Sequence, residues 1–251
     1  GPLLDPMQNP KAIEQNLIDN LPQKLAPVGE ALRLTKSNLP TETALIGFAG
    51  APWTVMTYMV EGGSSRDFAI TREWASKYPK QVDALLGSLI ESTILFLSLQ
   101  ASAGADALML FDSWASAVPA AQRDWLVTRP AQLIVEGLRK NGHQQPVIGF
   151  PKGIGEGLIA YVDQSGVDAV GLDHGVDPVW VDRNLPQNFP VQGNLDPLSL
   201  LQAGPEMFRD IDHILDAFAN RPHIFNLGHG IAPPTPTENV QLMLDHVRRH
   251  Q

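Results

Sequence analysis

The chain has 251 residues, of which 43% are hydrophobic and 18% are charged, a composition typical of folded globular proteins rather than disordered ones. Its 18 basic and 27 acidic residues give a formal charge of −9, which supports neither a nucleic acid nor an anionic membrane as a partner. The chain contains no cysteine, which excludes disulfides, thiolate nucleophiles, iron–sulfur clusters and cysteine-ligated zinc.

The first part of the chain, residues 1–42, is expected to be a meandering lead-in segment with one short helix. This expectation follows from its prolines, which are Pro2, Pro6, Pro10, Pro22, Pro27 and Pro40. The segment also lacks the basic and apolar regions of a signal peptide, so we expect a cytoplasmic protein.

After Thr43, short apolar runs alternate with longer amphipathic ones. Each run has four or five residues and is almost continuously hydrophobic, which is typical of buried parallel strands. The predicted strands are Ala44–Phe48, Ala107–Phe111, Val147–Phe150, Ala169–Leu172, Phe189–Gln192 and His223–Asn226.

Helices are predicted between these runs. Gln81–Ala103 carries apolar residues at helical spacing, and its stretch Leu85–Leu99 is predicted to be a buried helix that is too polar to span a bilayer. Near the C-terminus, Thr235 is predicted to cap a helix that starts with Pro236. One buried stripe is expected on this last helix, made of Val240, Met243, Leu244 and Val247.

The joints between helices and strands favour a closed barrel. Gly104 and Gly166 each precede an Asp and an apolar strand, as expected for a glycine that ends a helix in a repeated β/α unit. Polar or glycine-rich residues follow every predicted strand, whereas a doubly wound sheet concentrates such residues at one switch point. We therefore predict a TIM-type β/α barrel that forms a single domain.

Several motifs have alternative interpretations. The glycine-rich segment after Phe150 lacks the G-x-G-x-x-G spacing of a dinucleotide loop, and its Lys152 either binds a carboxylate or is an ordinary solvated lysine. His246 and His250 are four residues apart, but their place at a helix C-terminus favours a structural role over a metal site. His229 lies between two glycines directly after a strand, which favours a functional role.

Five segments of the chain, in order, resemble signatures of uroporphyrinogen decarboxylases. They are the segment Gly47–Ser65, Leu110-Phe-Asp-Ser-Trp, Val170-Gly-Leu-Asp, Val191-Gln-Gly-Asn-Leu-Asp-Pro and Asn226-Leu-Gly-His-Gly-Ile. The resemblance implies a (β/α)8 barrel, usually a homodimer, which converts uroporphyrinogen III to coproporphyrinogen III by removing four acetate carboxylates. It implies a cytoplasmic carboxy-lyase of haem biosynthesis that needs no cofactor and no metal.

Carried over position by position, the resemblance gives Tyr58, Ser113 and His229 as the catalytic residues. Phe48 and Phe111 match aromatic residues that line the family's cleft, and we add Lys152 as a candidate for binding substrate. A protonated pyrrole can itself accept the electrons released by decarboxylation, so the protein needs to supply a proton and to stabilise a cationic ring.

The front of the family pattern is not found in this sequence. The family's arginine-rich motif and its pyrrole-binding aspartate are missing, and six predicted strands are two fewer than eight. The charged residues expected near the strand ends are Arg66, Lys152, His174 and His229 against Asp67, Asp112, Asp173 and Asp196. Because this balance does not suit a substrate with eight carboxylates, we expect the isolated chain to be catalytically incomplete.

The sequence leaves two alternative functions. One is a methyltransferase of the same barrel superfamily, which would use a His/Cys zinc site that this chain cannot build without cysteine. The other is a degenerate barrel without catalytic activity, which the joint presence of Tyr58, Ser113 and His229 disfavours.

Overall fold

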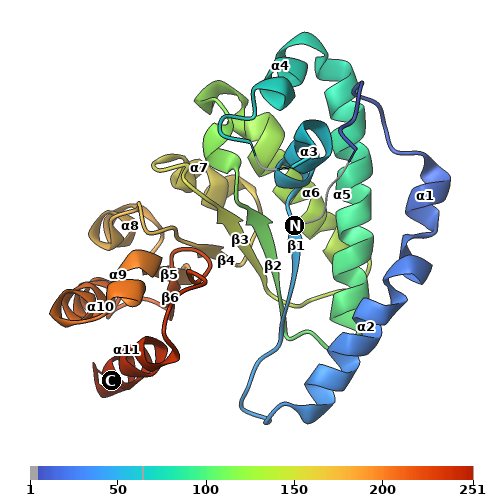
Figure 1. Cartoon of the computed structure of the whole chain (residues 1–251). Helices are drawn as coiled ribbons and strands as arrows, with labels where there is room; N and C mark the ends of the chain where they lie inside the picture. Colours follow the sequence, from blue (N-terminus) through green and yellow to red (C-terminus); the bar gives the residue numbers. More distant parts are fainter. Residues whose placement is uncertain (1–4, 64, 251) are drawn as a thin grey trace. The chain divides into compact units, whose positions relative to one another are not determined.

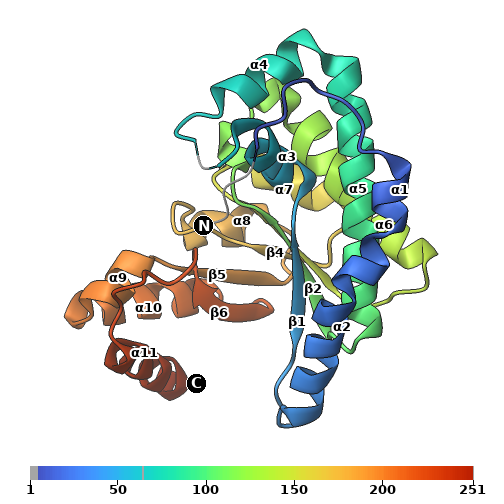
Figure 2. The same cartoon turned by 45° about the vertical axis from the view of Figure 1, so that its right-hand side comes forward.

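A computed structural model describes residues 5–63 and 65–250 (Figures 1 and 2). Residues 1–4, 64 and 251 lie outside the described residues, and with them Pro2 of the lead-in segment and one position of the segment Gly47–Ser65. The chain divides into two compact units, one formed by Gly1–Lys152 and Asp163–Val167, the other by Gly153–Val162 and Asp168–Gln251. That the units together form a single domain stays a prediction.

The first unit contains three parallel strands. They are β1 (Ile46–Gly50), β2 (Ala107–Asp112) and β3 (Val147–Pro151), and they pair in chain order with Phe48 opposite Met109 and Phe111 opposite Phe150. The helices of this part of the chain are α1 (Gln15–Asp19), α2 (Leu21–Asn38), α3 (Pro52–Glu61), α4 (Ala69–Lys77), α5 (Pro79–Ser102) and α6 (Arg129–Lys140). A π-helical turn, Asp124–Thr128, leads directly into α6.

The second unit also contains three parallel strands. β4 (Ala169–Gly171), β5 (Val191–Leu195) and β6 (His223–Leu227) pair in chain order. The remaining helices are α7 (Gly157–Gln164), α8 (Pro178–Asn184), α9 (Pro197–Gln202), α10 (Pro205–Ala217) and α11 (Thr237–His250). Within this unit α10 packs against β5, α8, α9 and α11.

All six predicted strands are confirmed within the described residues, with shifted ends. The largest shift is at β5, which was predicted as Phe189–Gln192 but continues to Leu195. Its polar residues Gln192 and Asn194 resemble a loop in the sequence, yet both are buried within the strand. The two glycine joints are also confirmed, because Gly104 has a φ of 107° and Gly166 a φ of 71°, a conformation that disfavours side chains.

The prediction for the lead-in segment is wrong. Instead of one short helix, the segment forms α1 and the 18-residue α2, which packs along α5 (Figure 1). Pro22 lies in the first turn of α2, where a missing N–H costs nothing, and only Pro27 interrupts the helix interior. The segment is also tied to the core, since the Ile13 N–H donates to Ser88 Oγ on α5 at 3.1 Å.

Helix α5 is the central helix of the first unit. An 18-residue window within this helix has a mean hydropathy of 1.7, long and apolar enough to cross a membrane, so the prediction that the helix is too polar to span a bilayer is wrong on this measure. In the structure, Val82, Leu85, Leu86 and Leu97 are buried, and the helix packs against β1, α2, α3 and α6. The helix therefore has the packing of a core helix.

The prediction for the last helix is partly wrong. Helix α11 begins at Thr237, two residues after the predicted cap Thr235. Of the predicted buried stripe only Met243 is buried, while Leu244 is exposed and Val240 and Val247 are half-buried. An apolar stripe in the sequence shows which face can be covered, and whether it is covered depends on the neighbouring elements.

Candidate functional site

Aromatic side chains form a row across the strands of the first unit. The rings of Phe48 and Phe111 meet edge to face at 5.8 Å, and those of Phe111 and Phe150 meet in the same way at 5.7 Å. Phe48 is 60% exposed, whereas Phe150 is buried. The structure thus brings the two predicted substrate-binding aromatics together and adds Phe150, which the sequence analysis did not select.

The backbone of Phe48 is held in place by a glutamine of α5. Gln100 is buried, accepts a hydrogen bond from the Phe48 N–H at 2.8 Å and donates one to the Phe48 carbonyl at 2.8 Å. The Leu45 carbonyl and the Ala51 N–H, at either end of β1, form hydrogen bonds with the chain at β2. Because successive residues of a strand point their N–H and carbonyl groups to opposite sides, the N–H and carbonyl of Phe48 point to the other edge of β1. Gln100 therefore fixes the strand that presents the Phe48 ring.

The end of β2 is joined to α3 by a buried polar network. Asp112 is 3% exposed, and its Oδ1 accepts a 2.6 Å hydrogen bond from the Thr54 hydroxyl. The same Thr54 oxygen accepts the Trp114 N–H at 3.3 Å, while the Trp53 indole N–H donates to the Trp114 carbonyl at 3.0 Å. The segment from Asp112 to Trp114 is thereby attached to the first turn of α3.

The carboxyl group in this network has an unusual proton affinity. Burial raises the pKa of Asp112 to about 7, although the hydrogen bond from Thr54 lowers it. At neutral pH this carboxyl is therefore partly protonated. The charge count from the sequence treated Asp112 as fully charged, and the raised pKa of its carboxyl corrects that assumption.

Two predicted catalytic residues lie on this framework. Tyr58 is on α3, is 36% exposed, and its ring centroid is 6.4 Å from that of Trp114. Ser113 lies between Asp112 and Trp114 directly after β2 and is half-buried. Lys152 follows β3, where its N–H donates to the Asp112 carbonyl at 3.1 Å. Ser113 and Lys152 thus follow the carboxyl ends of β2 and β3, and Tyr58, on the helix after β1, contacts Trp114 just after β2.

His229 belongs to the second unit and is exposed directly after β6. The preceding residue, Gly228, donates to the Leu195 carbonyl at 2.7 Å, and a Cβ at this glycine would overlap the backbone nitrogen of His174. A side chain is therefore excluded at Gly228, and the loops after β4 and β6 approach each other there. This close packing places the Gly228 backbone beside His174.

The loops of the second unit are built around two buried polar residues that were not among the predicted catalytic or substrate-binding residues. Asp173 accepts hydrogen bonds from the N–H groups of Gly153 and Gly175, at 2.8 Å and 2.9 Å. The side-chain amide of Asn194 donates to the carbonyls of Asp173 and Val176. These contacts fix the loop after β4.

A histidine in β6 also has a structural role. The pKa of His223 is lowered, chiefly by burial and also by the charge of Arg221. The hydrogen bond to the Gly193 carbonyl acts in the opposite direction and raises this pKa. The ring is therefore neutral near pH 7, and its Nε2–H donates to the Gly193 carbonyl at 2.7 Å. This bond secures the buried polar stretch of β5.

The candidate metal pair has other partners in the structure. His246 bonds to Asp212 at 2.6 Å and stacks on Phe208, and His250 pairs with Asp216 at 3.2 Å. Within residues 5–63 and 65–250, no group of three or more His, Cys, Asp or Glu side chains is arranged to hold a metal. The two histidines join α11 to α10 through Asp212 and Asp216.

Comparison with known proteins agrees with these motifs. Residues 1–250 match the family model described as uroporphyrinogen decarboxylase (URO-D). A uroporphyrinogen decarboxylase of Novosphingobium aromaticivorans is 48% identical over 248 residues, covering 99% of this chain and 72% of that protein. Another, from Maricaulis maris, is 44% identical with the same coverage of both chains.

A solved structure supports the fold. A methyltransferase from Methanosarcina mazei superposes with a TM-score of 0.81 over 97% of this chain and 71% of its own chain, at 16% sequence identity. At that identity the likeness shows the fold alone. Together with the family match it confirms the predicted TIM-type barrel class, of which the described residues supply six parallel strands.

Proposed function

Because the chain belongs to the uroporphyrinogen decarboxylase family, we propose that it acts in converting uroporphyrinogen III to coproporphyrinogen III as a carboxy-lyase that needs no cofactor. The observation that carries this proposal is the family match over residues 1–250, with relatives of that name at 41–48% identity. The 16% identity to a methyltransferase shows a shared fold and does not favour that activity.

The chemistry needs only proton transfer and stabilisation of charge. At each of four acetate arms the C–CO2 bond breaks, carbon dioxide leaves, and a proton takes its place, so that CH2–COO⁻ and H⁺ give CH3 and CO2. A pyrrole protonated at the carbon that bears the arm accepts the electron pair of the broken bond. A positioned proton donor and fixed dipoles are therefore the catalytic contributions expected of the protein.

The candidate residues suit these tasks. Tyr58 and Ser113 carry hydroxyl groups at the carboxyl end of the first unit's strands, which is the functional face of a TIM barrel. Phe48 and Phe111 offer an apolar surface for the macrocycle, and Lys152 is assigned to a carboxylate. His229 is assigned to carboxylate binding or proton transfer, which a histidine performs near neutral pH.

The assembly and location remain part of the proposal. The resemblance supports a homodimer located in the cytoplasm, and the acidic charge of −9 offers no support for nucleic acid as a partner. Sedimentation equilibrium of the full-length gene product tests the dimer. A mass of one protomer across the micromolar range would contradict it.

The activity is tested by anaerobic incubation of the full-length gene product with uroporphyrinogen III. Oxidised products are then separated by their number of carboxylates. We expect successive loss of four carboxylates and release of four CO2 per substrate, ending at the tetracarboxylate. Uroporphyrinogen that keeps all eight carboxylates would contradict the proposed function.

A further inference from the structure

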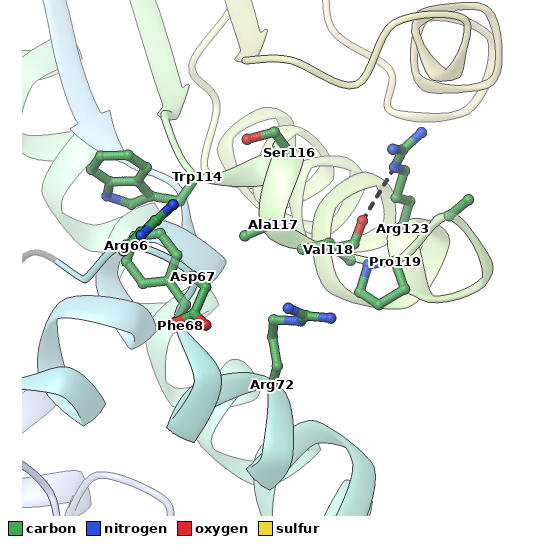
Figure 3. Close-up of a pocket in the computed structure, with 11 residues that line it drawn as sticks. Arg66, Asp67, Phe68, Arg72, Trp114, Ser116, Ala117, Val118, Pro119 and Arg123 are labelled. Atoms are coloured by element: carbon green, nitrogen blue, oxygen red, sulfur yellow. Dashed lines mark hydrogen bonds between the residues drawn. The ribbon is translucent and has the colours of Figure 1, made fainter.

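A pocket lined by arginines lies in the first unit. Its volume is about 550 Å³, and it lies between the start of α4 and the segment that follows β2. Arg66 and Arg72 come from the side of α4, and Arg123 comes from the other wall (Figure 3). Of these three arginines, only Arg66 belongs to the charge balance predicted from the sequence, because nothing in the sequence shows that Arg72 and Arg123 reach the same cavity.

The charge of this arginine pocket favours an anion. Three guanidinium groups line it against one carboxylate, that of Asp67. Within the described part of the chain, Arg66 and Arg72 form no ion pair, and both side chains are exposed. The Nε–H of Arg123 donates to the Val118 carbonyl at 3.4 Å, which positions this half-buried side chain at the wall. Guanidinium groups bind carboxylates through paired, charge-assisted hydrogen bonds.

One aromatic residue connects the arginine pocket to the predicted catalytic tyrosine. The Trp114 ring lines the pocket, lies 4.9 Å from the Phe68 ring and 6.4 Å from the Tyr58 ring. Its backbone is fixed by Thr54 and Trp53, as described above. A ligand in contact with Tyr58 can therefore extend past Trp114 into the pocket.

We propose that the arginine pocket binds a carboxylate arm of the tetrapyrrole while the macrocycle lies against Tyr58. This inference rests on the proposed function. The pocket is too small for a whole tetrapyrrole but holds one or two carboxylate arms, and the Ser116 hydroxyl at its opposite wall supplies a further hydrogen-bond donor. Arg66 and Arg72 are then binding residues, and Asp67 opposes binding by repulsion.

The arginine pocket is tested by measuring the affinity for tricarballylate with calorimetry at low ionic strength. Tricarballylate is a small tricarboxylate that cannot be decarboxylated by this route. We expect Arg66→Gln and Arg72→Gln each to weaken binding about tenfold, the usual effect of one charge-assisted hydrogen-bonding group. Asp67→Asn is expected to strengthen it. Arg209→Gln is the matched control, since Arg209 is exposed on α10 in the other unit and pairs with Glu206.

Two outcomes overturn the inference. One is tricarballylate affinity that is equal in wild type, Arg66→Gln and Arg72→Gln, and the other is inorganic phosphate binding more tightly than tricarballylate. In turnover assays, we expect the two arginine variants to raise KM for uroporphyrinogen III about tenfold, with the loss falling on KM rather than kcat. If tricarballylate binding depends on the arginines but wild type shows no turnover, the proposed function fails and the anion site itself stands.

Discussion

The hydroxyl of Thr54 donates a 2.6 Å hydrogen bond to the carboxyl group of Asp112, 58 residues away in the sequence. Because the same oxygen also accepts the Trp114 N–H, one threonine fixes the strand end that carries Ser113 and the indole that contacts Tyr58. The site framework of the first unit therefore depends on a buried pair of polar residues that do not themselves belong to the predicted catalytic set.

The raised pKa of Asp112 makes the unfolding free energy depend on pH. Its pKa is about 7 in the folded protein and 3.8 without burial, so between these values the folded state binds a proton that the unfolded state has lost. This contribution is fully present below pH 3.8 and is lost as the pH rises through 7, a change on the order of 4 kcal/mol. Asp112→Asn is expected to flatten the pH dependence of the unfolding free energy measured with urea from pH 5 to 8.

The control for this experiment is Asp106→Asn. The pKa of Asp106 is lowered by the Leu45 N–H and by Lys36, so its contribution has the opposite sign and is lost as the pH falls. An Asp112→Asn curve parallel to that of the wild type would show that the carboxyl is charged and solvated in the folded protein, contrary to the structure.

Thr54→Val tests the hydrogen bonds rather than the charge. Valine has a similar shape but leaves Asp112 and the Trp114 N–H without this partner, which should lower the unfolding free energy by about 1–3 kcal/mol. Thr54→Ser keeps the hydroxyl and serves as the matched variant. Equal destabilisation of the valine and serine variants would indicate that the lost methyl group, and not the hydrogen bonds, matters.

Gly228 and Gly230 form a matched pair on either side of His229. At Gly228 a Cβ would overlap the backbone of His174, whereas nothing lies within 4 Å of a Cβ at Gly230. Gly228→Ala should therefore shift the loop and lower the unfolding free energy by about 1–3 kcal/mol, while Gly230→Ala should change it little. Chemical denaturation of both variants checks this. A tolerated Gly228→Ala would mean that the loops after β4 and β6 do not approach closely.

The strands could be predicted from the sequence because each is a short apolar run that ends in polar residues. Phe111 and Phe150, for example, are in such runs and pair in register. The polar part of β5 could not be predicted, since Asn194 is buried only because its amide finds the carbonyls of Asp173 and Val176. The length of α2 was missed because its prolines were counted without their positions in the helix.

In the candidate site, too, local motifs could be predicted from the sequence, whereas contacts between distant residues could not. Tyr58, Ser113 and His229 were selected through local motifs, whereas their supporting contacts join residues far apart in the sequence. Asp112 was counted from the sequence as a charged residue near a strand end, and its burial depends on the packing of α3 against β2. Arg72 and Arg123 belong to no motif in the sequence, and only the folded chain brings them into one pocket.

The most direct test of the proposed activity is the rate at which the full-length gene product releases CO2 from uroporphyrinogen III, with and without Tyr58 and His229. We expect Tyr58→Phe and His229→Asn each to lower this rate by about ten- to a thousandfold, the usual range for proton-transfer and electrostatic groups, without a loss of folding. The matched variants Tyr78→Phe and His213→Asn, at exposed positions, should retain the wild-type rate. Absence of CO2 release by the wild type, or unchanged rates in both site variants, would contradict the account.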